Sequence, residues 1–107
     1  MEVIGSDNEN GKKIIMKAVI LQPILVSCFE GVTISRLIST VSSIMPLQND
    51  LVKKYLFYMI EFNLITYSGR LKSFLIAKEG INLLLQIELM KSIEKLSTDQ
   101  IFLQINE

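Results

Sequence analysis

Six side chains in the middle of the chain have the types and spacing needed to bind nucleic acid. They are Gln48, Asn49, Lys53, Lys54, Arg70 and Lys72. The amides can pair with the N6 and N7 atoms of adenine, and the cations can bind guanine or phosphate oxygens. Arg36 is a further candidate for a contact with the phosphate backbone. Each residue also has a plain structural interpretation, because lysine pairs commonly lie on solvated helix faces and hairpin tips are commonly polar.

Residues for catalysis, by contrast, are scarce. The chain has no histidine, and its single cysteine, Cys28, cannot build a structural zinc site. Neither a G-x-x-x-x-G-K-S/T phosphate-binding loop nor a G-x-G-x-x-G motif is present. The carboxylates are scattered, so a paired acid and base is not indicated. We therefore expect a binding protein with no catalytic residues, no metal site and no cofactor, in which Cys28 is a small buried hydrophobe.

The distribution of charge favours the same segment. The formal net charge of the 107 residues is zero. Residues 31–78 nevertheless contain six basic and two acidic residues, a net charge of +4, whereas both flanking segments are acidic. A basic surface attracts nucleic acid electrostatically. The positive charge therefore coincides with the candidate binding residues.

Composition bounds the class of protein. Half of the residues are apolar, so we expect part of the apolar surface to be buried against another subunit. The longest apolar run, residues 14–29, is interrupted by Lys17 and Pro23 and is shorter than the roughly 20 residues of a membrane span. Residues 1–10 lack the features of a signal peptide, and one cysteine permits no internal disulfide. These features predict a cytoplasmic protein that makes no contact with a membrane.

Hydrophobic spacing predicts a single, mostly helical α+β domain. Residues 1–11 are expected to form a disordered tail, and a first helix is expected to start at Lys12 and to kink or restart at Pro23. Thr33 is the expected N-cap of a second helix, which Pro46 prevents from continuing. A third helix is predicted over about residues 48–63, closed by Asn63. Its core-facing residues are expected to be Val52, Tyr55, Leu56, Met59 and Ile60.

The remaining predicted elements are a hairpin and a last helix. Short strands are expected at residues 64–67 and 73–76, with Gly69 supplying the turn. The last helix, residues 77–96, is apolar nearly all round, which predicts that one of its faces meets a second copy of the chain. The expected contact residues are Leu83, Ile87, Met90 and Ile93. Residues 97–107 are predicted to be a tail or a short helical extension.

Three short pieces of the chain carry a family resemblance. They are Lys53-Lys54-Tyr55-Leu56, Phe62-Asn63-Leu64-Ile65 and Lys78-Glu79-Gly80. In this order and spacing they resemble the small archaeal winged-helix transcription regulators, over roughly residues 14–90. The chain departs from that family at Ala77, where such proteins often have a threonine, and in its lower net charge.

The resemblance implies a fold and a function. The fold is a winged helix-turn-helix over residues 12–96, with a two-strand wing and a long C-terminal dimerisation helix. The function is sequence-specific binding of double-stranded DNA by a homodimeric transcription regulator, with the third helix in the major groove and the wing on the backbone or minor groove. The alternative is a winged-helix module that docks another protein in a larger assembly, favoured by the zero net charge and the apolar excess.

Overall fold

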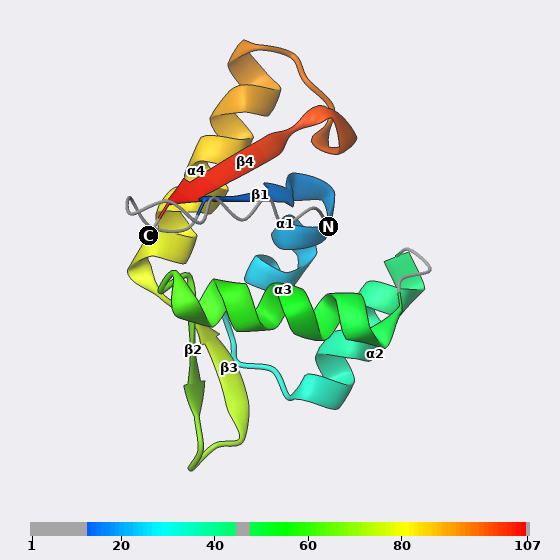
Figure 1. Cartoon of the computed structure of the whole chain (residues 1–107), viewed down its shortest axis with the longest axis vertical. Helices are drawn as coiled ribbons and strands as arrows, with labels where there is room; N and C mark the ends of the chain where they lie inside the picture. Colours follow the sequence, from blue (N-terminus) through cyan, green and yellow to red (C-terminus); the bar gives the residue numbers. More distant parts are fainter. Residues whose placement is uncertain (1–12, 45–47, 107) are drawn as a thin grey trace.

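The fold is α+β and mostly helical, with four helices and two small antiparallel sheets in the part described (Figure 1). The computed structural model describes residues 13–44 and 48–106, so the tail predicted for residues 1–11 and the break at Pro46 lie outside the described residues. In chain order the elements are β1 (Lys13–Lys17), α1 (Ala18–Ser27), α2 (Ile34–Ile44), α3 (Asn49–Glu61), β2 (Ile65–Ser68), β3 (Ser73–Ile76), α4 (Lys78–Ile93), a 3₁₀ turn (Thr98–Gln100) and β4 (Phe102–Asn106). None of the described helices is long and apolar enough to cross a membrane.

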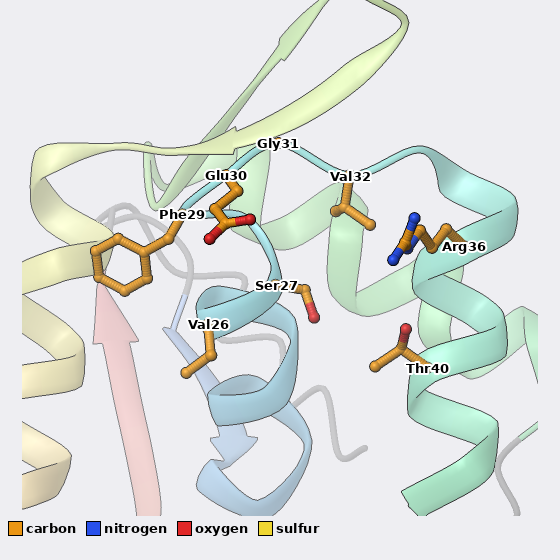
Figure 2. Close-up of a pocket in the computed structure, with 8 residues that line it drawn as sticks. All are labelled: Val26, Ser27, Phe29, Glu30, Gly31, Val32, Arg36 and Thr40. Atoms are coloured by element: carbon orange, nitrogen blue, oxygen red, sulfur yellow. The ribbon is translucent and has the colours of Figure 1, made fainter.

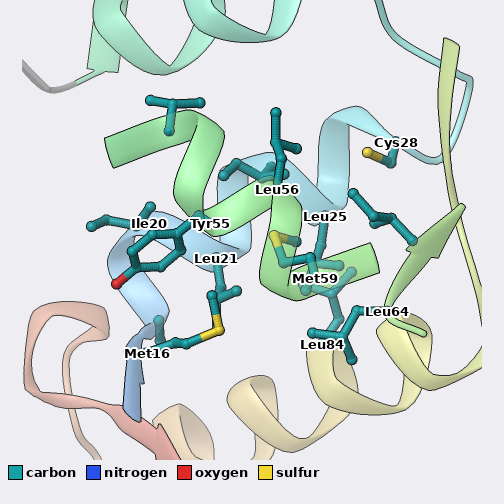
Figure 3. Close-up of a cluster of buried hydrophobic side chains, with 14 of the residues drawn as sticks. Met16, Ile20, Leu21, Leu25, Cys28, Tyr55, Leu56, Met59, Leu64 and Leu84 are labelled. Carbon is teal, nitrogen blue, oxygen red and sulfur yellow. The ribbon is translucent and has the colours of Figure 1, made fainter. Parts of the chain in front are cut away.

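The core forms where α1, α3 and α4 meet beneath the β1–β4 sheet. Helix α1 lies in the centre of the molecule and buries Leu21, Ile24 and Leu25. Figure 3 shows Tyr55 of α3 beside residues of α1 and β1, with the side chain of Leu84 from α4 closing the same cluster. The buried residues of the described chain form one continuous apolar cluster and include no charged side chain.

Helices α2 and α3 begin and end as the local residue types predict. The side chain of Thr33 accepts a hydrogen bond from the backbone N–H of Arg36 at 3.3 Å, which confirms the predicted N-cap. Helix α3 buries the predicted face except for Ile60, which is 40% exposed, so that prediction was wrong for this residue. Asn63 closes α3 with φ of 62°, the left-handed conformation that asparagine tolerates.

The β2–β3 hairpin also matches the predicted strands. The two strands pair from Ile65 with Ile76 to Ser68 with Ser73. Val32, between α1 and α2, forms an isolated bridge to Phe74, with N···O distances of 3.1 and 2.7 Å. This bridge ties the start of α2 to the hairpin that follows α3.

The ends of the domain differ in part from their predictions. Within the first predicted helix, residues 13–17 form strand β1 and only Ala18–Ser27 are helical, and after residue 97 a short 3₁₀ turn is followed by strand β4. The two strands pair antiparallel in register from Lys13 with Asn106 to Lys17 with Phe102. Because Ile14 and Met16 are buried and Lys17 is exposed, β1 follows the two-residue period of a strand. The helical spacing assigned to this segment belongs to α1, which begins one residue later.

Helix α4 differs from its prediction in length and in orientation. It ends at Ile93 rather than at residue 96, and Lys95 adopts a positive φ of 56°. Ile87, predicted to meet a second copy, is fully buried within the chain, and Leu83 and Met90 pack against the same core. The apolar side chains that α4 leaves exposed are Ile81, Leu85, Leu89 and Ile93. Residues three or four apart share a helix face, so these four form one stripe.

Gly80 permits the close approach of α4 to the start of the hairpin. The backbone N–H of Ala77 donates to the carbonyl oxygen of Leu64 at 2.9 Å, which holds the first turn of α4 against β2. A Cβ atom on Gly80 would overlap that carbonyl oxygen and would lie 2.9 Å from Ile76 Cγ1 and 3.1 Å from Leu25 Cδ2. Glycine is therefore required at this position by packing.

We expect Gly80→Ala to lower the free energy of unfolding by about 3 kcal/mol, because the backbone of Leu64 and α4 must separate to admit the methyl group. Urea denaturation measures the change. Gly69→Ala is the matched control, since a Cβ there has no neighbour within 4 Å, and it should leave stability within about 0.5 kcal/mol. Equal effects of the two substitutions would contradict the packing role of Gly80.

Tyr55 joins α3 to the junction of β1 and α1. Its side chain is fully buried, and its hydroxyl oxygen accepts a hydrogen bond from the backbone N–H of Lys17 at 3.0 Å. In the register of the sheet, Ala18 donates to Ile101 at 3.0 Å, so the N–H of Lys17 points away from β4. Burial raises the pKa of Tyr55, while the hydrogen bond from Lys17 opposes that rise.

Tyr55→Phe should destabilise the protein by about 1–2 kcal/mol, because it leaves the N–H of Lys17 without its partner while keeping the ring in place. Thermal unfolding followed by circular dichroism tests this expectation. Tyr67→Phe is the control: the Tyr67 side chain is half exposed and its hydroxyl makes no hydrogen bond to another described residue. A Tyr55→Phe protein as stable as the wild type would show that water replaces the tyrosine hydroxyl at no cost.

Candidate nucleic-acid interface

Helix α3 has a buried apolar face and an exposed, polar N-terminal end. The N-cap and the first two turns of α3 expose Gln48, Asn49, Lys53 and Lys54 to solvent, whereas Val52 and Tyr55 are buried. Gln48 occupies the N-cap position, but its side chain makes no capping hydrogen bond. The amide of Gln48 is therefore available to a ligand, together with that of Asn49.

The basic residues of α3 form no ion pair with another described residue. Among the described residues, the only ion pair within 4.0 Å joins Lys91 and Glu88 on α4. Lys53 and Lys54 thus keep their charge at the surface, where an anionic ligand can neutralise it. Asp50, in the first turn of the same helix, is placed where a carboxylate interacts favourably with the helix dipole.

The tip of the β2–β3 hairpin is the second cluster of candidate residues. Arg70 and Lys72 are both exposed in the loop of residues 69–72. Gly69 was expected to supply the turn, yet the residue with a positive φ is Lys72, at 51°. A lysine in this conformation is strained, because its Cβ approaches the backbone in a way that glycine avoids.

The hydroxyls of Ser68 and Ser73 hold this tip. The role of these two serines was not predicted from the sequence. The backbone N–H of Leu71 donates to Ser68 Oγ at 3.1 Å, and Ser73 Oγ donates to the carbonyl oxygen of Leu71 at 3.0 Å. The available signal was the pair of serines that closes the strands, since serine side chains commonly bond to nearby backbone groups in turns.

The structure keeps the two clusters apart. Figure 1 shows the hairpin extending away from the body at the C-terminal end of α3, while the N-terminal end of α3 lies next to α2. A helix of 13 residues is about 20 Å long, so the clusters are separated by roughly that distance. An extended anionic ligand could contact both at once, whereas a small molecule could not.

Arg36 belongs to neither cluster. It lines a pocket of about 500 Å³ between the end of α1 and α2, with Val26, Glu30 and Thr40 among its other lining residues. Figure 2 shows the guanidinium of Arg36 and the carboxylate of Glu30 on different sides of this space. The structure therefore does not place the Arg36 side chain with the other predicted binding residues.

Cys28 lies at the C-terminal end of α1 and is fully buried. Burial raises the pKa of its thiol to about 11. The thiol is therefore protonated at neutral pH and packs as a small apolar group, as predicted.

No model of a known protein family matches this chain, and no curated protein matches it either. The candidate interface is thus defined by the exposed side chains of α3 and of the β2–β3 tip. Its features are exposed side-chain amides, lysines with no ion pair among the described residues, and a basic hairpin held by serine hydroxyls.

We expect Lys72→Gly to stabilise the protein by about 0.5–1 kcal/mol, because glycine adopts a positive φ without strain and this gain exceeds its larger entropy loss on folding. Lys72→Ala separates conformation from charge, since alanine removes the ammonium group and keeps the strain. The alanine variant should show no such gain in urea denaturation. Equal stabilisation by both would attribute the effect to charge.

Proposed function

We propose that this chain is a winged-helix protein that binds double-stranded DNA and regulates transcription as a homodimer. The observation that carries the proposal is the exposed N-terminal end of α3. It combines the exposed side-chain amides of Gln48 and Asn49 with two lysines that have no counterion among the described residues. That combination suits both the edges of bases and the phosphates beside them.

The order of the elements supports the winged-helix assignment. Helices α2 and α3 precede a two-stranded hairpin, and Val32 forms an isolated bridge to Phe74 of β3. This arrangement fixes the hairpin relative to α2 and α3. In the proposed complex, α3 enters the major groove with its N-terminal residues at the base edges, and the hairpin acts as the wing.

The proposed dimer uses the exposed stripe of α4, which replaces most of the contact residues predicted from sequence. Ile93 remains from the predicted set and is 72% exposed, while Ile81, Leu85 and Leu89 join it. Burying such a stripe against its own copy removes apolar surface from water.

The same stripe also favours the alternative function, a winged-helix module that docks another protein. A protein partner covering α4 would account for the exposed leucines and isoleucines equally well. The two functions differ in their dependence on salt. Binding to DNA weakens steeply as salt rises, with a slope of about −0.9 per phosphate contacted, whereas apolar docking does not.

We expect Lys53→Ala combined with Lys54→Ala to weaken binding to a mixed-sequence duplex by about 10-fold per lysine at 0.1 M salt, and to make the salt slope shallower by about 0.9 per lysine. Fluorescence anisotropy over a series of salt concentrations measures both quantities. Because both side chains are exposed, the free energy of unfolding should stay within about 0.5 kcal/mol of the wild type.

Lys91→Ala combined with Lys95→Ala provides the control with the same change in charge. These lysines lie near and just after the C-terminal end of α4, which Figure 1 shows on the far side of the molecule from α3, and their loss should leave the affinity within about threefold, through the general field only. Equal weakening by the two double variants would contradict a specific role for α3. Absence of binding by the wild type at low salt would overturn DNA binding in favour of protein docking.

A further inference from the structure

The tip of the β2–β3 hairpin presents an apolar side chain between two cations. Leu71 is 60% exposed and stands between Arg70 and Lys72 in the loop of residues 69–72. It is absent from the apolar cluster that the buried residues form, as are the other exposed apolar side chains. A leucine exposed at the end of a projecting hairpin does not stabilise the described chain. A contact with another molecule would explain why an apolar side chain stands there.

The backbone on either side of Leu71 is held in place. Its N–H and its carbonyl oxygen are both bonded to serine side chains, from Ser68 and Ser73, at 3.1 and 3.0 Å. Lys72 adds the positive φ that turns the chain back into β3. Because the polar groups of Leu71 are satisfied inside the tip, its side chain can enter an apolar site without burying an unpaired backbone group.

The strands directly behind the tip are also packed together. Tyr67 and Phe74, on opposite strands, pack with their ring centroids 4.9 Å apart. Phe74 is buried and is bonded through its backbone to Val32. The tip is therefore a preorganised projection, which lowers the entropy cost of placing it in a narrow groove.

We infer that the hairpin tip enters the minor groove of duplex DNA, where Leu71 inserts between two base pairs and bends the duplex. This inference rests on the proposed DNA binding and adds a deformation of the DNA to it. Apolar side chains that enter the minor groove unstack a base step and kink the duplex toward the major groove. Arg70 and Lys72 bind the phosphates or the groove floor on either side of the inserted leucine.

Charge complementarity favours DNA over a protein or a lipid surface as the occupant. A base step is an apolar slot bordered by phosphates on both strands, which matches a leucine with a cation on each side. An apolar pocket on a protein would force Arg70 and Lys72 to lose water without a counterion, at a substantial cost. A single leucine would also bury too little apolar surface to anchor the chain in a membrane.

Resonance energy transfer between dyes at the two ends of a short mixed-sequence duplex tests the inference on the whole chain. The wild type should shorten the end-to-end distance as expected for a kink of about 20–90°. Leu71→Gln keeps the size of the side chain but makes insertion unfavourable. It should leave the duplex straight and weaken binding about 10-fold, which is the loss expected for one buried leucine partly offset by the cost of unstacking.

Leu71→Met is the matched control, because methionine is also apolar and long enough to insert. It should restore both the bend and the affinity to within about threefold of the wild type. The salt slope should be the same for all three proteins, since none of these changes removes a phosphate contact. Because the side chain of Leu71 is exposed, the three proteins should unfold at the same temperature within about 2 °C.

The outcomes separate this inference from the proposed function. A wild type that binds with a steep salt dependence but does not bend the duplex overturns the insertion of Leu71 and keeps DNA binding. Equal bending by the wild type and Leu71→Gln does the same. A wild type that does not bind DNA at low salt overturns both. Binding of the chain to uncharged vesicles or to a protein through Leu71 would show that Leu71 contacts that partner instead of the minor groove.

Discussion

The rotation of α3 in the fold is set by its buried face, Val52, Tyr55, Leu56 and Met59, in which the Tyr55 hydroxyl must also reach the N–H of Lys17. A buried tyrosine must satisfy its hydroxyl, and the only partner it has among the described residues is the N–H where β1 gives way to α1. Once the Tyr55 ring is seated in the core, helical geometry directs Lys53, Lys54 and the N-terminal amides outward. The orientation of the surface proposed to contact DNA therefore depends in part on a buried polar contact. The types of the surface residues do not reveal that contact.

Local patterns were sufficient to predict the middle of the domain. The Thr33 cap, the buried face of α3, the left-handed Asn63 and both hairpin strands follow from neighbouring residue types and short spacings. The ends of the domain could not be predicted in this way. Strand β1 is stabilised by pairing with β4, which is distant in sequence, and the spacing that suggested a helix belongs to the α1 residues directly after it.

The candidate site was predictable in its residue types and less so in its geometry. Lys53, Lys54, Arg70 and Lys72 are exposed as basic side chains on a helix and a turn commonly are. The periodicity of α4 gives two apolar faces but not which of them the core covers: the face with Ile87 packs against the core, and the exposed stripe lies on the other side of the helix. Leu71 was not singled out from the sequence, although the serines on either side of it gave a local signal, since their hydroxyls bond to its backbone two and three residues away.

The pairing of β1 with β4 has a consequence for the order in which the domain is built. On the ribosome β1 emerges before the four helices and the hairpin, and it must remain without its partner until residues 102–106 have left the exit tunnel. During that interval its isoleucines and Met16 lack the strand that covers them in the finished domain. The helices can assemble from contacts closer in sequence, so closure of the sheet is a late step of synthesis and a period in which a chaperone would find an unpaired strand to bind.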